Sequence, residues 1–279
     1  MKKVKVGIIG YTGRLGKPLV EILQKHPAVE IVYTESRSEG CYGTLSEAEN
    51  VFLALPYDES VNYLKKLSGK KIIDLSIDHR DDSSWTYGLP EIFGDEIKDA
   101  KKVANPGCYA TSILIALYPL KDKIISIRIS STSGMSGAGM AQKKEDNFVS
   151  YKEGDQHPQI KEVSRFIDIN DILFVPQRID STEKGIISTI FVRTCKKISN
   201  VQKLYQDAYK NCQFVRICDS IETKNVIDTN FCDIKIMEFA NEVLIISTLD
   251  NLLKGGAGQA VQNFNLMYGL KESLGLTGG

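Results

Sequence analysis

A glycine-rich stretch directly after the first apolar run limits the folds open to this chain. The stretch reads Gly7-Ile-Ile-Gly10-Tyr11-Thr12-Gly13-Arg-Leu-Gly16 and joins a β-rich run to a helical one. Glycines permit positive φ and let a pyrophosphate approach the amides at a helix N-terminus. The spacing departs from Gly-x-Gly-x-x-Gly, so a plain tight turn is the alternative. The strand-turn-helix context favours nucleotide binding by Gly7, Gly10, Tyr11, Thr12 and Gly13.

The first hundred residues alternate β-rich and helical runs. Strands are expected at residues 4–9, 30–34, 50–55 and 71–77, with helices at 15–25 and around 60–67. Strands that alternate with helices indicate a doubly wound parallel sheet of the Rossmann type.

The remainder of the chain has a different pattern. Strand candidates lie at residues 124–130, 171–175, 186–194, 213–218, 231–238 and 242–248. Only residues 201–211 look helical between them, which predicts a mostly antiparallel or mixed sheet with helices on one face. A last helix at 258–270 is expected to return to the first domain. We therefore predict an α/β plus α+β protein, with a discontinuous nucleotide-binding domain (1–105 and 256–279) and a second domain (106–255).

Composition excludes several classes of partner. Lysine plus arginine and aspartate plus glutamate number 35 each, so no overall field favours nucleic acid or an anionic membrane. The first apolar run is too short for a signal peptide, and no run approaches a membrane span. The six cysteines form no Cys-x-x-Cys pair and have no histidine at metal-ligand spacing. We expect a small-molecule partner, reduced thiols in the cytoplasm and no metal site.

The end of the second strand bears on the choice of nucleotide. The residues there are Thr34-Glu35-Ser36-Arg37-Ser38. Arg37 offers a bidentate fork to a ribose 2′-phosphate, with Ser36 and Ser38 as donors, which favours NADP over NAD. Glu35 would repel that phosphate unless its side chain points elsewhere. The alternative is a solvated loop arginine.

A cysteine falls at a predicted helix start. Asn105 suits an N-cap and Pro106 a first helical residue, so Cys108 lies in the first turn ahead of an apolar run. The helix dipole there stabilises a thiolate, although a small buried cysteine is the common alternative. A thiolate beside a nicotinamide can hold an acyl group as a thioester while hydride reaches its carbonyl carbon.

Three histidines are available as the partner base. His26 ends the first helix and is expected at the surface, while His79 follows a strand at the ligand-binding edge of the sheet. His157 lies in a polar loop between strands of the second domain, and elimination favours it as the base.

These stretches carry a family resemblance that spans nearly the whole chain. Matching segments are Gly10-Tyr-Thr-Gly13, Thr34-Glu-Ser-Arg-Ser38, Asp74-Leu-Ser-Ile-Asp-His-Arg80, Gly88-Leu-Pro-Glu91, Asn105-Pro-Gly-Cys-Tyr109, Ser133-Gly-Met-Ser-Gly-Ala-Gly139 and Asp250-Asn-Leu-Leu-Lys-Gly-Gly-Ala-Gly-Gln-Ala260. In this order they resemble the N-acetyl-γ-glutamyl-phosphate reductase family, within the aspartate-semialdehyde dehydrogenase superfamily.

The resemblance implies an oxidoreductase of arginine biosynthesis that uses NADP(H) to reduce an acyl phosphate through a cysteine thioester. It makes Cys108 the nucleophile and His157 the base, and it adds Asn251 to the cofactor site. Substrate-binding residues implied by the family motifs are Arg80, Asn105, Ser133, Ser136 and Gly137, the serine loop forming an anion nest. Arg178, Lys143 and Lys184 are candidates for further anion ligands. A homo-oligomer, dimer or tetramer, built through the sheet of the second domain is also implied.

Two alternatives stay open at this point. A relative of the same superfamily would act on an aspartyl or a carrier-bound aminoadipyl phosphate with the same chemistry. A protein of another class would bind NADP without catalysis and use Cys108 as an oxidisable sensor.

Overall fold

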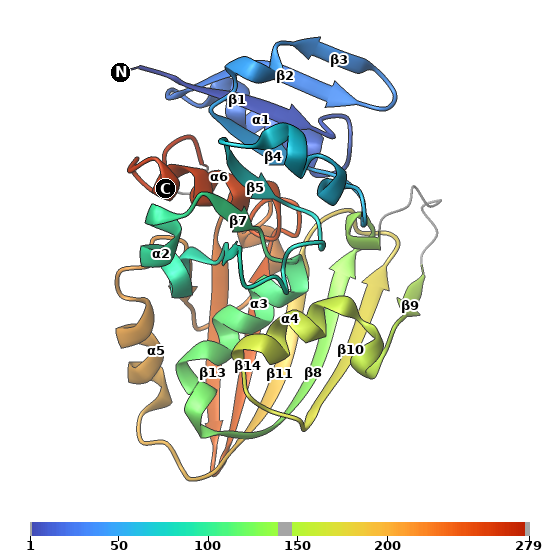
Figure 1. Cartoon of the computed structure of the whole chain (residues 1–279). Helices are drawn as coiled ribbons and strands as arrows, with labels where there is room; N and C mark the ends of the chain where they lie inside the picture. The colour runs from blue at the N-terminus through green and yellow to red at the C-terminus, as the bar shows by residue number, and fades with distance from the viewer. Residues whose placement is uncertain (1, 139–146, 277–279) are drawn as a thin grey trace. The chain divides into compact units, whose positions relative to one another are not determined.

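The computed structural model describes residues 2–138 and 147–276. It divides into two compact units, one formed by Met1–Gly107 with Gly256–Gly279 and the other by Cys108–Gly255. Each unit holds its own seven-stranded sheet (Figure 1). The predicted α/β plus α+β class is confirmed.

The first unit contains a nearly parallel sheet in the order β3-β2-β1-β4-β5-β7-β6, in which only β3 runs antiparallel to its neighbour. The strands are β1 (Val4–Ile9), β2 (Val29–Ser36), β3 (Gly40–Gly43), β4 (Asn50–Leu53), β5 (Lys71–Asp74), β6 (Thr86–Tyr87) and β7 (Lys102–Ala104). Its helices are α1 (Gly16–Lys25), α2 (Pro90–Asp99) and α6 (Ala257–Met267).

Alternating side chains of the strands divide between two apolar clusters. Val6 and Ile8 of β1 pack with Leu19 of α1 and with Val261 and Phe264 of α6. The next position on the other face, Ile9, belongs to a second cluster with Leu53, Leu67 and Ile72. The last helix of the chain is therefore part of the core of the first unit.

The helix expected around residues 60–67 is wrong. The structure has two 3₁₀ turns instead, Ser60–Asn62 and Leu64–Leu67. The Asp78 carboxylate accepts hydrogen bonds from the backbone amides of Asp58 and Ser60 and from the Ser60 hydroxyl. Side-chain bonds of this kind compete with the intrahelical ladder, so an α-helix does not propagate from Ser60.

The second unit contains a mixed sheet in the order β12-β13-β14-β11-β8-β10-β9, with parallel pairs only at β8/β10 and β12/β13. The strands are β8 (Ile124–Gly134), β9 (Phe148–Ser150), β10 (Ile172–Ile179), β11 (Ile186–Thr194), β12 (Val215–Ile217), β13 (Cys232–Phe239) and β14 (Glu242–Leu249). Its helices are α3 (Cys108–Leu117), α4 (Pro158–Phe166) and α5 (Val201–Tyr209), and α3 and α4 lie on the same face of the sheet (Figure 1).

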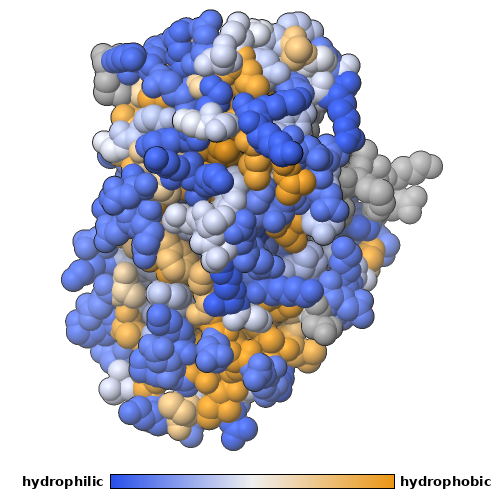
Figure 2. Space-filling view, viewed as in Figure 1, coloured by the Kyte–Doolittle hydropathy of each residue, from blue (hydrophilic) through white to orange (hydrophobic). Residues whose placement is uncertain are grey.

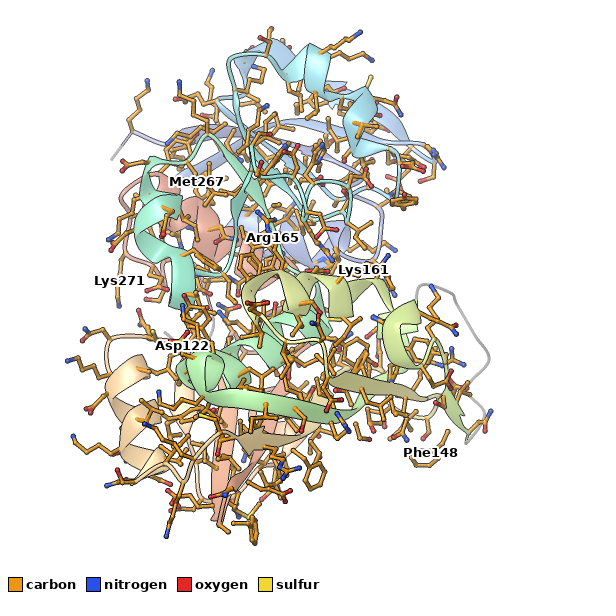
Figure 3. All side chains as sticks on the ribbon, turned by 60° about the horizontal axis from the view of Figure 1, so that its bottom comes forward. Asp122, Phe148, Lys161, Arg165, Met267 and Lys271 are labelled. Carbon is orange, nitrogen blue, oxygen red and sulfur yellow. The ribbon has the colours of Figure 1, made fainter. Side chains whose placement is uncertain are left out.

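Helix α4 occupies a region that the sequence suggested was a polar loop. Ile160 and Val163 face inward and are buried, whereas Lys161 and Arg165 lie one turn apart on the exposed side (Figure 3). Pro158 occupies a position at the start of the helix that suits proline. The loop assigned to His157 is therefore a helix start.

The surface of the two units differs in hydropathy. Hydrophilic residues cover most of the visible face of the first unit, while apolar residues gather on the second unit near α4 and the strand ends below it (Figure 2). Among the described residues, no helix combines the length and apolarity that a membrane crossing requires.

Candidate active site and nucleotide pocket

The turn between β1 and α1 is too tight for side chains at two of its glycines. Gly10 has φ +89° and donates its amide to the Glu35 carbonyl at 2.7 Å. A Cβ at Gly10 would overlap the carbonyl oxygen of Ala54, and one at Gly16 would overlap that of Gly10. The sequence thus forms a cradle of bare backbone at the start of α1, which is what a pyrophosphate requires.

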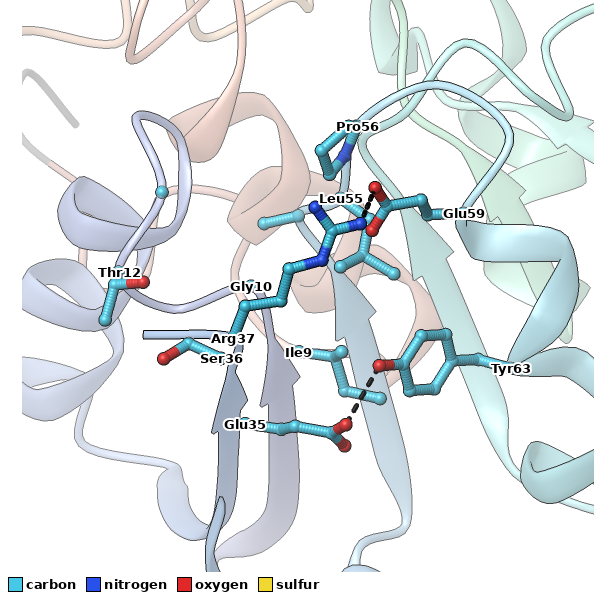
Figure 4. Close-up of a pocket in the computed structure, with 12 residues that line it drawn as sticks. Ile9, Gly10, Thr12, Glu35, Ser36, Arg37, Leu55, Pro56, Glu59 and Tyr63 are labelled. Atoms are coloured by element: carbon cyan, nitrogen blue, oxygen red, sulfur yellow. Dashed lines mark hydrogen bonds and ion pairs between the residues drawn. The ribbon is translucent and has the colours of Figure 1, made fainter. Parts of the chain in front are cut away.

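A pocket of about 210 Å³ lies beside this turn (Figure 4). Its lining includes the predicted residues Gly10, Thr12, Gly13, Ser36 and Arg37. The hydroxyls of Thr12 and Ser36 lie 3.2 and 3.4 Å from that of Ser38, so three hydroxyls gather at one side. Of the other predicted residues, Gly7 lies within β1, and the Tyr11 phenol donates to Glu39.

Two acidic side chains of the pocket have different partners. Glu35 accepts hydrogen bonds from the phenols of Tyr33 and Tyr63 at 2.6 and 2.9 Å. Burial and this bond raise the pKa of Tyr63 to about 12, so the phenol stays a donor. Glu59 is ion-paired with Arg37, whose side chain is 80% exposed (Figure 4). Glu35 is thus engaged by two phenols, while Glu59 holds the arginine predicted to bind a 2′-phosphate.

Arg80 and Asn105 lie in a buried polar network of the first unit. Arg80 donates to the backbone carbonyls of Asn105 and Leu75 at 2.9 and 3.0 Å. The Asn105 carboxamide donates to the Gly256 carbonyl and accepts from Asn263. These bonds fix the segment that leads into Cys108. Binding of substrate by Arg80 and Asn105 stays a prediction.

The other two histidines also have defined places. His79 pairs with Asp74 at 2.6 Å and stacks on Trp85 with ring centroids 4.1 Å apart. His26 is buried and its ring nitrogen contacts the Asn265 carboxamide at 3.0 Å, so the prediction that it lies at the surface is wrong. The reason is that the C-terminal segment packs over the end of α1.

Cys108 is the first residue of α3, so it lies in the first turn as predicted. The helix begins two residues later than predicted, because the Asn105 carboxamide bonds to Gly256 and Asn263 instead of capping it. The rest of the helix is buried, whereas Cys108 is partly exposed and is not part of a disulfide. Gln159 of α4 accepts the first-turn amides of Tyr109 and Ala110 on its Oε1 at 2.8 and 3.1 Å. The helix start that favours a thiolate is therefore capped by a side chain from a different helix.

A glycine turn packs directly against the thiol-bearing residue. A Cβ placed on Gly255 would lie 2.6 Å from the Cβ of Cys108 and 2.7 Å from the Asn251 carbonyl. The Asn251 carboxamide accepts from the Gly185 amide at 2.7 Å and donates to the Ser136 hydroxyl at 2.8 Å. The Asn251 side chain therefore joins the serine loop to residue 185, and its predicted contact with a cofactor stays a prediction.

His157 lies in an aromatic cage. Its ring centroid is 5.3 Å from those of Tyr109 and Phe174 and 6.0 Å from that of Tyr151. Burial, and secondarily the positive charge of Lys152, lower the pKa of His157 to about 4. Its Nδ1 accepts the Gln159 amide at 3.3 Å, so the neutral ring carries its proton on Nε2. At neutral pH, His157 is an uncharged imidazole with an N–H available on Nε2.

The serine loop does not present the predicted nest through its first amides. Gly134, Met135 and Ser136 donate their amides to the carbonyls of Gly185, Thr182 and Glu183, respectively. The Ser133 hydroxyl donates to the Gly134 carbonyl. Ser133, Ser136 and Gly137 stay predicted substrate ligands, but the amides of residues 134–136 are already used within the protein.

The further anion ligands suggested by the sequence have acidic partners where the structure describes them. Arg178 pairs with Asp180, and Lys184 pairs with Asp228 at 2.7 Å. Lys143 lies outside the described residues. No group of three metal-ligating side chains is found within residues 2–138 and 147–276.

Three residues of these sites escaped the sequence analysis: Glu59, Gln159 and Gly255. Glu59 bonds to Arg37, 22 residues away, and Gln159 to the Tyr109 amide, 50 residues away, and no local sequence pattern links such distant positions. Gly255 did carry a signal, because it lies in the Lys-Gly-Gly-Ala-Gly stretch, but its contact with Cys108 requires the fold.

Comparison with known proteins decides the family. The profile described as "Semialdehyde dehydrogenase, dimerisation domain" matches residues 108–251, and "Semialdehyde dehydrogenase, NAD binding domain" matches residues 42–100. N-acetyl-gamma-glutamyl-phosphate reductase from Pelodictyon phaeoclathratiforme is 37% identical, over 98% of this chain and 99% of the relative. The protein of that name from Christiangramia forsetii is 34% identical, over 98% of both chains.

The chain belongs to the N-acetyl-γ-glutamyl-phosphate reductase family. The resemblance seen in the sequence is thereby confirmed, and the chain is an oxidoreductase enzyme of amino-acid biosynthesis.

Solved structures show that this family shares its fold with a related one. Aspartate semialdehyde dehydrogenase II from Vibrio cholerae aligns with a TM-score of 0.78 at 17% identity, over 96% of this chain and 99% of that one. Aspartate semialdehyde dehydrogenase from Candida albicans, solved with NADP, gives a TM-score of 0.74 at 14% identity, over 96% and 99%. At such identities the likeness concerns the fold.

Proposed function

We propose that the protein reduces N-acetyl-γ-glutamyl phosphate to N-acetylglutamate semialdehyde, a step of arginine biosynthesis. The Cys108 thiolate attacks the acyl carbon, a C–S bond forms, and the C–O bond to phosphate breaks with release of inorganic phosphate. NADPH, when bound, supplies the hydride that reduces the resulting thioester carbonyl. The resulting hemithioacetal anion then collapses: the C–S bond breaks, the semialdehyde leaves, and the thiolate returns to Cys108.

The observation that carries this proposal is the place of Cys108 as first residue of α3 in a chain that aligns almost end to end with enzymes of this name. The dipole of a buried helix stabilises a thiolate at the first residue of that helix. His157 is neutral above its depressed pKa and offers Nε2–H as a hydrogen-bond donor to the oxyanion. In this tautomer the ring donates a hydrogen bond through Nε2, so we propose that His157 polarises the carbonyl oxygen; its role as the base stays a prediction.

We propose NADP(H) as the cofactor. The bare backbone at Gly10 and Gly16 suits the pyrophosphate. Arg37 and the hydroxyls of Ser36 and Ser38 would hold the 2′-phosphate, once Glu59 releases the arginine. The two phenols that engage Glu35 keep its carboxylate occupied elsewhere.

We also propose that the enzyme is a homo-oligomer built on the open face of the second sheet. Across that face Leu173 of β10 pairs with Arg128 of β8, which pairs with Phe191 of β11, and Leu244 of β14 follows. Leu173 and Phe191 are 49% and 51% exposed. A row in which exposed apolar side chains flank Arg128 suits a second copy of the same face, and the matching profile bears the description of a dimerisation domain. A cytoplasmic location would keep the Cys108 thiol reduced.

The reverse reaction tests the proposal. Purified protein is incubated with N-acetylglutamate semialdehyde, inorganic phosphate and NADP, and NADPH is followed by its absorbance. A parallel assay uses aspartate semialdehyde. A phosphate-dependent signal with the acetylated aldehyde is expected. A signal with aspartate semialdehyde alone would reassign the substrate, and no signal with either aldehyde would refute the reductase function.

A further inference from the structure

The first turn of α3, which begins at Cys108, is capped by hydrogen bonds that the proposed mechanism does not use. Gly107, the residue before α3, has no side chain that could cap it. Gln159 acts as a cap instead: its Oε1 accepts hydrogen bonds from the backbone amides of Tyr109 and Ala110. Those amides carry much of the positive potential at the helix start. A side chain of α4 thus caps two of the first-turn amides of α3.

The same residue also holds the imidazole. The Gln159 backbone amide donates to Nδ1 of His157, which is the N-cap of α4. This bond selects the ring tautomer with the proton on Nε2. One residue therefore contacts the helix turn of Cys108 through its side chain and the ring of His157 through its main chain.

We infer that Gln159 is a positioning residue that keeps the helix start neutral in charge and so lets the Cys108 thiolate be the anion there. This inference rests on the proposed role of Cys108 as nucleophile. A carboxamide and a carboxylate can accept the same two amides, but a carboxylate adds a negative charge close to the thiol. The uncharged cap satisfies the amides and leaves the dipole to the thiolate.

The tyrosine, histidine and lysine side chains around this turn do not supply a competing anion. The phenol of Tyr109 is neutral, since burial and Tyr151 raise its pKa. His157 is uncharged at neutral pH, and Lys152 is cationic. The strands β11 and β14 contact α3 through neutral hydroxyls: those of Ser188 and Ser247 bond to Ser112. The Ser247 hydroxyl also contacts the Cys232 thiol. Glu162 is a buried carboxyl on α4, one turn beyond Gln159; it is present in the wild type and in every variant, so it does not contribute to the difference between them.

The test measures the ionisation of Cys108 directly, without substrate or nucleotide. Alkylation by iodoacetamide is followed from about pH 5 to about pH 10, and the Cys108 peptide is quantified by mass spectrometry, because only the thiolate reacts. Gln159→Glu should raise the midpoint by about one pH unit, with roughly tenfold slower alkylation below both midpoints. The matched control is Gln202→Glu, which adds the same charge at an exposed position of α5 and should leave the midpoint unchanged.

A second variant covers the case in which Gln159→Glu does not fold. Gln159→Met removes the acceptor without adding charge, so the midpoint should stay at or below that of the wild type. An unchanged midpoint in folded Gln159→Glu, or a raised midpoint in Gln159→Met, would overturn the inference. Neither result depends on turnover, so a failure here is distinct from a failed reverse reaction.

Discussion

The Cβ of Cys108 occupies the space that a side chain at Gly255 would need, since a Cβ built on Gly255 lies only 2.6 Å away from it. The opposite side of Gly255 is closed by the backbone of Asn251, which cannot move as a flexible side chain can. We expect Gly255→Ala to displace the thiol-bearing turn, lowering the free energy of unfolding by about 1–3 kcal/mol and the reductase rate at least about tenfold. Urea unfolding and the alkylation rate of Cys108 would measure both effects.

Gly94 provides the matched control for that substitution. It lies in α2, and a Cβ there would meet no atom within 4 Å. Gly94→Ala should therefore be neutral or slightly stabilising. An equal loss of stability in both variants would show that the contact with Cys108 is not the cause.

Replacement of Cys108 by serine should abolish the reverse reaction and leave nucleotide binding intact. The hydroxyl has nearly the same size as the thiol but does not ionise near neutral pH at this helix start. Phosphate-dependent turnover by Cys108→Ser, or loss of NADP binding measured by calorimetry, would contradict the assignment of Cys108 as nucleophile.

The pKa of His157 has a consequence for stability at acid pH. Because the folded-state pKa is lowered to about 4 from 6.5, the unfolded chain binds the proton first as pH falls. Above about pH 6.5 the ring is neutral in both states, and the free energy of unfolding is unaffected. Between about pH 6.5 and about pH 4 only the unfolded chain binds the proton, so the free energy of unfolding falls. We expect the stability of wild type relative to His157→Asn to fall by roughly 2–3 kcal/mol between about pH 7 and about pH 4.

Paired urea titrations at those two pH values would measure the difference. His26 also has a lowered pKa, caused by burial, but it is present in both proteins and cancels. A constant difference across the pH range would mean that His157 titrates near its ordinary value in the folded protein.

The pair formed by Arg37 and Glu59 should set the preference between the two nicotinamide nucleotides. Arg37→Ala is expected to weaken NADP binding by roughly ten- to a hundredfold and NAD binding far less, since only NADP loses a charged hydrogen bond. Glu59→Gln removes the competitor of the phosphate and should tighten NADP up to about fivefold, a typical limit for an exposed pair. Equal effects of either substitution on NADP and NAD would refute the 2′-phosphate role.

The open face of the second sheet makes a prediction about assembly. Phe191→Asp places a charge in the middle of the apolar row and should convert the oligomer to a monomer in light scattering. Phe148→Asp is the control, because Phe148 is even more exposed, at 73%, but belongs to the edge strand β9 (Figure 3). Dissociation by the control alone would place the interface at the sheet edge.

Elements whose start and end depend on neighbouring residues could be predicted from the sequence, whereas elements that depend on distant residues could not. The strand at Val4–Ile9 and the place of Cys108 in the first turn of a helix follow from neighbours in the chain, and the sequence predicts both, although the helix begins two residues later than expected. Helix α4 was missed because its N-cap is His157, although Pro158 and the buried Ile160 and Val163 fit a helix. The 3₁₀ turns at Ser60 were missed because a carboxylate 18 residues away holds their amides.

The site shows the same division. The sequence predicts Cys108 and His157 from the residue types that the chemistry needs, and the structure adds the helix start at Cys108 and the aromatic cage around His157. Gln159 could not have been selected, because the two amides that it caps become its neighbours only when α3 and α4 pack together.

The helix α6 gives the order of synthesis a consequence for folding. Its side chains complete the core around Val6 and Ile8, and its amides Gln259 and Asn263 hold the Gly88 carbonyl. A ribosome that has released residues 1–107 must still make the roughly 150 residues of the second unit before α6 emerges, which takes on the order of ten seconds or more. The first unit therefore has all seven strands of its sheet long before it has the helix that packs on them, and the apolar face around Val6 and Ile8 stays uncovered until α6 is made.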